Sequence, residues 1–323
     1  MDSHKLANEY RSVIANWDTK CSVRTKPRRF LAEEDHDRLF FSADLTPATS
    51  HALLLSHGPS SVRELLIHRL YSYLDFTTVL EQEIVNPVVL RLSRDAFGLR
   101  LPDPMRFDAY RIYCDEAYHA LFSVDIKTQI EASTDVSYTR SADPEFVRAI
   151  QQAKESVPSN LQILIDFCAT VVSETLISGS LTQIPQDPAV ASFVREAMAD
   201  HAADERTHHA YFTKAFEIAW PQIDKSTQRL LAPYFADFIL GFLTPDLSGQ
   251  RDALWRMGFT REESAQIVWE AHPMNETLIG IRHAARSTLR LLSRTGVINH
   301  PHAKQHFYDL GIITAENLPS EEM

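Results

Sequence analysis

The residues of this chain best suited to chemistry form two short motifs, Asp115-Glu116-x-x-His119 and Asp204-Glu205-x-x-His208. A Glu-x-x-His unit alone is a weak signal, because about one is expected by chance at this composition. Two such units, both preceded by aspartate, would coincide by chance on the order of a few times in a thousand. Residues three apart share one face of a helix, so each Glu and His pair can bind one ion. The two motifs therefore predict a site for two metal ions.

A pair of metal ions also needs bridging carboxylates from other helices, and Glu174 is the clearer candidate. It is the only charged residue between Phe167 and Leu181, and it shares an apolar helical stripe with Phe167 and with Ile177 or Ser178. A buried carboxylate without a partner is costly. We therefore expect Glu174 to bind a metal ion, and an ion pair with a basic residue elsewhere in the chain is the alternative.

Glu81 is the second bridging candidate. It continues an apolar stripe that includes Leu74, Ile84 and Val88, so it is expected to point inward. Glu83 lies well round the helix from that stripe. The side of the helix on which each residue lies favours Glu81 over Glu83 as the ligand. The alternatives are that Glu83 is the ligand or that Glu81 is a surface carboxylate.

A third histidine extends the second motif. His201 lies four residues before Glu205, so His201, Glu205 and His208 form one continuous face of a helix. His201 alone would be interpreted as a core histidine with a hydrogen-bond partner, and its spacing favours a ligand instead. Mixed imidazole and carboxylate ligation is typical of iron or manganese, not of calcium or thiolate-bound zinc. His209 is turned away from this face and is expected to be exposed.

The aspartates of the two motifs have a predicted role of their own. Histidine ligands usually donate their second ring N–H to a carboxylate, which fixes the tautomer and the orientation of the ring. Asp115 and Asp204 are each expected to accept this bond from the ligand histidine on the facing helix. No catalytic residue is predicted beyond the metal ligands.

The elements that must position these residues are helices. The chain has only nine glycines in 323 residues, which leaves few of the turns that hairpins and nucleotide-binding loops need. Helical periodicity, prolines and capping boxes at Ser61-x-x-Glu64 and Thr260-x-x-Glu263 set the expected helix boundaries. The predicted helices are 61–93, 104–130, one beginning at 143–145, one after 158, 187–220, 222–242, 260–272 and 276–294. The sequence predicts an all-α, ferritin-like helical bundle with additional C-terminal helices.

We expect one domain in three parts. Residues 1–58 form an N-terminal segment that packs on the bundle, residues 59–220 form the metal-binding bundle, and residues 221–323 form a helical extension. The basic stretch from Lys20 to Arg29 is expected to be a solvated arm.

Composition excludes several classes of partner. The net charge of -11 argues against nucleic acid, which needs a basic surface. No apolar run opens the chain, and the most apolar region, from Leu230 to Thr244, is short and carries Asp237. We therefore expect no signal peptide, no membrane partner and a cytoplasmic location. Three widely spaced cysteines suit a reducing compartment. A homodimer is left open.

The whole ligand set resembles that of the p-aminobenzoate N-oxygenase family of diiron proteins. The seven residues, in order and with similar spacing over roughly 60–220, are Glu81, Glu116, His119, Glu174, His201, Glu205 and His208. The histidine at 201 is the specific element, since ribonucleotide reductase small subunits and bacterial multicomponent monooxygenases generally lack it. The resemblance implies two iron ions, dioxygen as co-substrate and oxidation of an amine to a hydroxylamine, nitroso or nitro product in natural-product biosynthesis. An external reductase or ferredoxin must supply electrons, because no flavin or nicotinamide fingerprint appears.

The substrate and the exact reaction have alternatives. An arylamine is the direct analogy, and an aliphatic amine or an amino acid tethered to a carrier protein is the second possibility. A ferritin-like ferroxidase would be shorter and would not need His201. A radical-generating subunit would form a stable tyrosyl radical, and a metal-free helical interaction protein would bind no iron.

Overall fold

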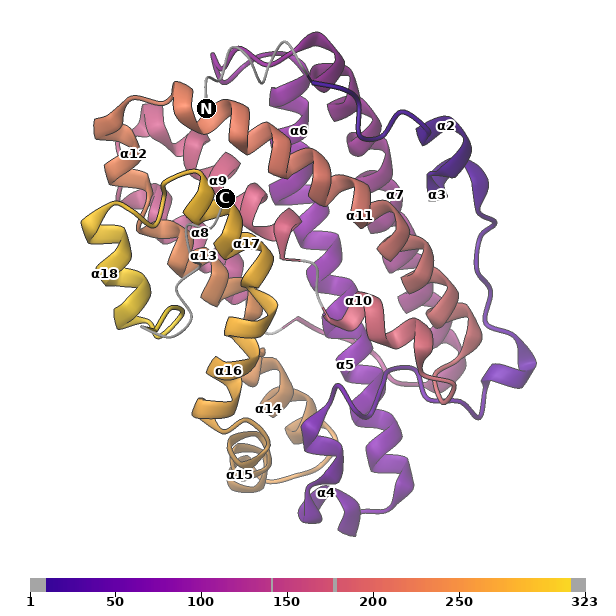
Figure 1. Ribbon diagram of the computed structural model, residues 1–323. Helices are drawn as coiled ribbons and strands as arrows, with labels where there is room; N and C mark the ends of the chain where they lie inside the picture. Colours follow the sequence, from indigo (N-terminus) through magenta and orange to yellow (C-terminus); the bar gives the residue numbers. More distant parts are fainter. Residues whose placement is uncertain (1–9, 141, 177–178, 315–323) are drawn as a thin grey trace.

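The chain folds almost entirely into helices. The computed structural model describes residues 10–140, 142–176 and 179–314, and within them the only β-type pairing is an isolated parallel bridge between Leu39 and Val190. The all-α, ferritin-like bundle with additional C-terminal helices is therefore confirmed (Figure 1). Residues 1–9 and 315–323 of the predicted terminal parts, and Ile177 and Ser178 of the predicted stripe, lie outside the described residues.

Four long helical segments form the bundle. They are α5 (Pro59–Val79) continuing through η3 (Leu80–Val85) into α6 (Asn86–Ser93), then α7 (Asp103–Thr134), α9 (Gln162–Thr175) and α11 (Ser192–Ala219). Helix α7 packs against α5 and α6, and α11 packs against both α7 and α9 (Figure 1). Apolar side chains from each segment, among them Val88, Ile112, Phe167 and Phe216, meet in one fully buried core. This packing brings the inward faces of four segments together.

The first long helix is interrupted by a turn of π-helix, η3, which ends two residues before Pro87. Proline has no N–H to donate to the carbonyl four residues earlier, and its ring crowds that carbonyl. The backbone widens instead, so that the N–H of Asn86 donates to the carbonyl of Glu81, five residues before it. Such π-turns are frequent at functional sites, and this one contains Glu81.

Two helix starts differ from the sequence prediction. Helix α5 begins at Pro59 after Gly58, whose φ of 93° favours glycine, so the predicted capping box at Ser61-x-x-Glu64 is wrong. Helix α11 begins at Ser192 and not at Asp187. Its first backbone N–H groups are capped by the distant Asp35, which accepts from Ser192 N at 2.8 Å. A cap supplied from outside the local sequence leaves no motif at the helix start.

The remaining helices connect the bundle segments or follow them in the C-terminal extension. They are α8 (Glu145–Glu155), η4 (Ser159–Leu161), α10 (Gly179–Gln183), η5 (Ile184–Gln186), η6 (Trp220–Gln222), α12 (Lys225–Leu231), α13 (Tyr234–Leu243), α14 (Leu247–Arg256), α15 (Arg261–Ala271), α16 (Met274–Ala284), α17 (Arg286–Arg294) and α18 (Pro301–Asp309). The capping box at Thr260 and Glu263 is confirmed, whereas the helix predicted over 222–242 is broken at Pro233 and α14 was not predicted. The bundle core continues into Phe235, Leu289 and Phe307, which supports our proposal that the extension belongs to the same domain.

The most apolar part of the extension is longer than the sequence suggested. By length and composition alone, the helical stretch Lys225–Arg256, which contains α12, α13 and α14, could cross a membrane. A buried core helix passes the same test, and within this stretch Phe235, Phe238 and Ile239 are fully buried.

The N-terminal segment lies across the bundle and is not a solvated arm. It contains α2 (Trp17–Lys20), α3 (Ser22–Thr25), η1 (Glu33–Asp35), η2 (Pro47–Ser50) and α4 (Ala52–Ser56). Helix α3 contacts both α7 and α11 (Figure 1). The arginines of the basic stretch form ion pairs with these helices, Arg28 with Asp125 at 2.6 Å and Arg29 with Asp200 at 2.6 Å. The prediction failed because acids on two distant helices supply the partners.

Candidate metal centre

The bundle brings all seven predicted ligands into one buried cluster. Three overlapping groups have potential ligand atoms within 4.8 Å of one another: Glu81, His119, His201 and Glu205; Glu116, His119, Glu205 and His208; and Glu81, Glu116 and Glu174. Every side chain in these groups is buried. Two overlapping sets that share His119 and Glu205 are an arrangement suited to two ions side by side.

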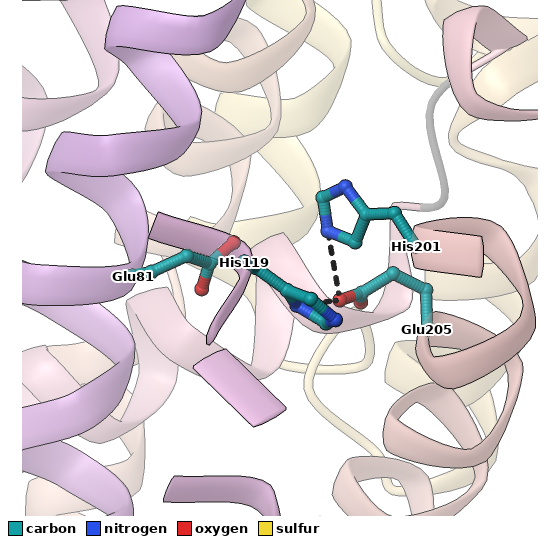
Figure 2. A group of neighbouring side chains, drawn as sticks. All are labelled: Glu81, His119, His201 and Glu205. Atoms are coloured by element: carbon teal, nitrogen blue, oxygen red, sulfur yellow. Dashed lines mark ion pairs between the residues drawn. The ribbon is translucent and has the colours of Figure 1, made fainter. Parts of the chain in front are cut away.

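Each bundle segment contributes to the cluster in its own way. The π-turn supplies Glu81, which is 2% exposed, whereas Glu83 on the same turn is exposed and lies outside the cluster. Glu174 lies in the last turn of α9. Figure 2 shows Glu81 approaching His119 from one side of the cluster while His201 and Glu205 of α11 approach from the other.

The carboxylate of Glu205 lies at the centre of the three imidazoles. Its Oε1 is 3.2 Å from Nε2 of His201 and 3.4 Å from Nδ1 of both His119 and His208 (Figure 2 shows the first two histidines). The two oxygens of Glu116 each lie 2.8 Å from one Nδ1, those of His119 and His208. Nitrogen and oxygen donors from two facing helices therefore converge on a common space.

Many of these converging atoms have no hydrogen bond. Among the described residues, the buried side-chain atoms without a hydrogen-bond partner include Oε2 of Glu81 and Glu174, Oε1 of Glu116 and Glu205, and Nδ1 of His208. Oε1 of Glu116 and Nδ1 of His208 are only 2.8 Å apart, yet they lack hydrogen-bond geometry. Buried polar atoms are almost always satisfied. Unsatisfied donor atoms that face one point fit a bound cation.

The charges of the cluster fit a cation for the same reason. Burial, and then the neighbouring carboxylates, raise the pKa of Glu81 and of Glu174 well above the ordinary value. Burial opposes the charged form of Glu205 as well, but His208 and His201 outweigh it and hold the pKa of this carboxyl well below its usual range. Four buried carboxylates lie close together, so their mutual repulsion needs positive charge to compensate it.

The two aspartates of the motifs contact the histidines of the facing helix. Nε2 of His119 lies 3.2 Å from Oδ2 of Asp204, and Nε2 of His208 lies 3.2 Å from Oδ2 of Asp115. An ionised carboxylate only accepts hydrogen bonds, so it favours the tautomer with the proton on Nε2. That tautomer leaves the Nδ1 lone pair of each histidine directed into the cluster.

Sequence reasoning missed two residues behind these aspartates. The indole Nε1 of Trp17 donates to both carboxylate oxygens of Asp115, at 2.9 and 2.8 Å. The backbone N–H of Ser22 donates to both oxygens of Asp204, at 3.2 and 3.3 Å. Neither residue belongs to a motif, and each is far from its partner along the chain, so no spacing could have revealed the contact.

His209 differs from its prediction. It is half-buried and not exposed, because Ser287 packs over it, with Oγ 3.2 Å from Nε2 of the histidine. It lies outside all three ligand groups.

One side of the cluster opens into a cavity of about 1000 Å³. Of the candidate ligands, Glu81, Glu174, His201 and Glu205 line it, together with the apolar side chains Phe76, Leu80, Leu176, Leu240 and Phe242. The N-terminal helices α2 and α3 cover the side where the two aspartates lie. A small molecule can therefore approach the cluster from the cavity side, where it would pass these apolar side chains.

The family model described as P-aminobenzoate N-oxygenase AurF matches residues 26–296 of the 323-residue chain. The matched region includes all seven candidate ligands and both aspartates, whereas Trp17 and Ser22 precede it. No curated protein matches this chain.

Proposed function

The chain belongs to the p-aminobenzoate N-oxygenase AurF family, a family of oxygenases, and from this membership we propose that it is a diiron enzyme that oxidises an amine nitrogen with dioxygen. The observation that carries the proposal is the buried cluster of four carboxylates and three imidazoles whose unpartnered atoms converge. We propose that two iron ions are held by all seven predicted ligands, namely Glu81, Glu116, His119, Glu174, His201, Glu205 and His208. Oxygen and nitrogen donors of this kind suit iron.

The protein's part in the reaction is to hold the metal ions and to orient their ligands and the substrate. When bound, the iron pair supplies the activation of dioxygen for transfer of oxygen to nitrogen. Asp115 and Asp204 keep the rings of His208 and His119 in one orientation. The apolar lining at Leu80 and other cavity residues keeps water from the cluster and packs against the substrate. Electrons come from a separate donor, a reductase or a ferredoxin.

We propose a small aminoaryl compound as the substrate, because the family acts on one and because the cavity wall near the cluster is apolar. The outer cavity contains Arg140, which is paired with Asp75, and Arg69, for which no acid lies within ion-pair distance among the described residues. Arg69 precedes Glu81 by twelve helical residues, a rise of about 18 Å. A substrate that contacts both Arg69 and the cluster must be longer than one aromatic ring. The second candidate is therefore a longer amine, such as one tethered to a carrier protein.

Anaerobic reconstitution tests the proposed function. The protein is loaded with ferrous iron, the iron is counted, and the sample is exposed to ¹⁸O₂ with a panel of aryl, aliphatic and carrier-bound amines. We expect iron to bind as a pair and ¹⁸O to appear on nitrogen in a product identified by mass spectrometry. Iron that oxidises at the same rate with every amine, without a labelled product, would show a ferroxidase instead.

The role of His201 has a separate test. We expect His201→Ala to weaken one of two iron-binding steps at least about tenfold and to leave the other nearly unchanged, because His201 belongs to the ligand group that contains Glu81 and not to the group of Glu116, His119, Glu205 and His208. Titration with ferrous iron under anaerobic conditions measures both steps. The control is His209→Ala, which removes a half-buried histidine of the same helix outside the cluster. Equal binding curves for both variants would remove His201 from the ligand set.

A further inference from the structure

We propose that electrons enter the iron pair through the indole of Trp17, on the side of the cluster opposite the substrate cavity. The inference rests on the proposed function, since it concerns how the metal pair is reduced. It assigns a role to a residue outside the sequence range that the family model matches.

A short hydrogen-bonded chain joins Trp17 to the cluster. The indole N–H donates to Asp115 at 2.8 Å, and Asp115 lies 3.2 Å from Nε2 of His208, whose Nδ1 faces Glu116 and Glu205. Asp115 and His208 are buried, whereas Trp17 is only half-buried. Two contacts therefore connect a solvent-accessible aromatic ring to a metal ligand, without a gap between the groups.

The equivalent position on the other motif is built differently. Asp204 contacts His119 as Asp115 contacts His208, but its oxygens are held by the buried backbone N–H of Ser22. A backbone amide is thus sufficient to orient such an aspartate. The indole at Asp115 adds a π system that reaches the surface, and orientation alone does not require one.

The hydrogen-bonded contacts from His208 through Asp115 to Trp17 run away from the substrate cavity. Glu81, Glu174, His201 and Glu205 line the cavity, whereas Trp17, Asp115 and His208 do not. Helices α2 and α3 lie on the outer side of α7 and α11 (Figure 1). An electron donor at Trp17 would therefore not compete with an amine in the cavity.

The electron balance is simple. Each external one-electron donor of low potential, such as a reduced iron–sulfur protein, loses one electron, and one ferric ion becomes ferrous. Two donors reduce one pair. No bond forms or breaks along the chain, and the indole keeps its N–H.

The test compares two variants with a matched control. Trp17→Phe removes the indole and its N–H, Trp17→His keeps an N–H donor for Asp115 but removes the indole, and Trp269→Phe alters an indole that is 74% exposed. The iron-loaded, oxidised full-length proteins are mixed anaerobically with reduced methyl viologen, and the loss of ferric absorbance is followed. Iron content and reduction potential are measured on the same samples.

We expect both Trp17 variants to be reduced at least about tenfold more slowly than wild type, with the control unchanged. Iron content and potential should stay close to wild type. A wild-type reduction rate in Trp17→His would overturn the proposal, because Trp17 would then act only by positioning Asp115. The proposal would also be overturned if the slower reduction of both variants were accounted for by a changed reduction potential or by loss of iron. Failure of the wild-type protein to bind iron would instead contradict the proposed function.

Discussion

Glu116→Gln is expected to abolish amine oxidation, with a loss of more than about 100-fold, which exceeds the effect typical of outer contacts to a metal site. Each oxygen of Glu116 faces a different imidazole, those of His119 and His208, so this carboxylate connects the two halves of the cluster. Glutamine has nearly the same shape, but it replaces one acceptor oxygen by a neutral NH₂ group. The substitution therefore removes the carboxylate that faces both imidazoles without leaving a cavity.

The measurement is iron content together with product formation from an arylamine. The matched control is Glu83→Gln, which makes the same chemical change on an exposed residue close to Glu81. Thermal melting by circular dichroism shows that the variant is folded. A Glu116→Gln protein that retains two irons and its activity would contradict the proposed role of Glu116 as a metal ligand.

Glu174→Leu is expected to stabilise the metal-free protein while it prevents assembly of the iron pair. Glu174 is 3% exposed, carries no ion pair with a basic residue among the described residues, and faces other carboxylates. Burial and the neighbouring carboxylates disfavour the ionised form of Glu174, and replacing buried ionic groups by well-packed apolar side chains of similar volume is often neutral or stabilising by about 1–4 kcal/mol. Function then depends on a residue that destabilises the fold.

Chemical denaturation with and without chelator measures the stability of the metal-free protein and the stabilisation by iron. The free energy of unfolding of the metal-free variant should exceed that of metal-free wild type, and added ferrous iron should stabilise wild type much more than the variant. Glu83→Leu, on the exposed side of the helix, should show neither effect. A metal-free Glu174→Leu protein less stable than wild type would instead favour the alternative that a basic residue pairs with Glu174.

Several corrections share one physical origin. The start of α11 and the solvation of the basic stretch were predicted from local sequence, but Asp35 caps the helix and Asp125 and Asp200 bind the arginines. Local propensity is a weak guide wherever a distant side chain satisfies the backbone or the charge. The same applies to Trp17, whose partner lies on another helix.

The sequence by itself determined the helical bundle and the composition of the candidate centre. Residues three and four apart share a helix face whatever the tertiary packing, so the faces that carry Glu116 with His119, and His201 with Glu205 and His208, could be read directly. Glycine scarcity and apolar periodicity determined the fold class in the same local way.

Only the tertiary structure decided how these faces meet and what surrounds them. The π-turn that contains Glu81 was not predicted, although the burial of Glu81 and the exposure of Glu83 agree with the facing that regular spacing predicts. The convergence of Glu205 with three imidazoles, the contacts of Trp17 and Ser22 behind the aspartates, and the cavity on the opposite side all arise between segments far apart in the chain. Such contacts depend on how helices pack, and periodicity within one helix carries no information about its neighbours.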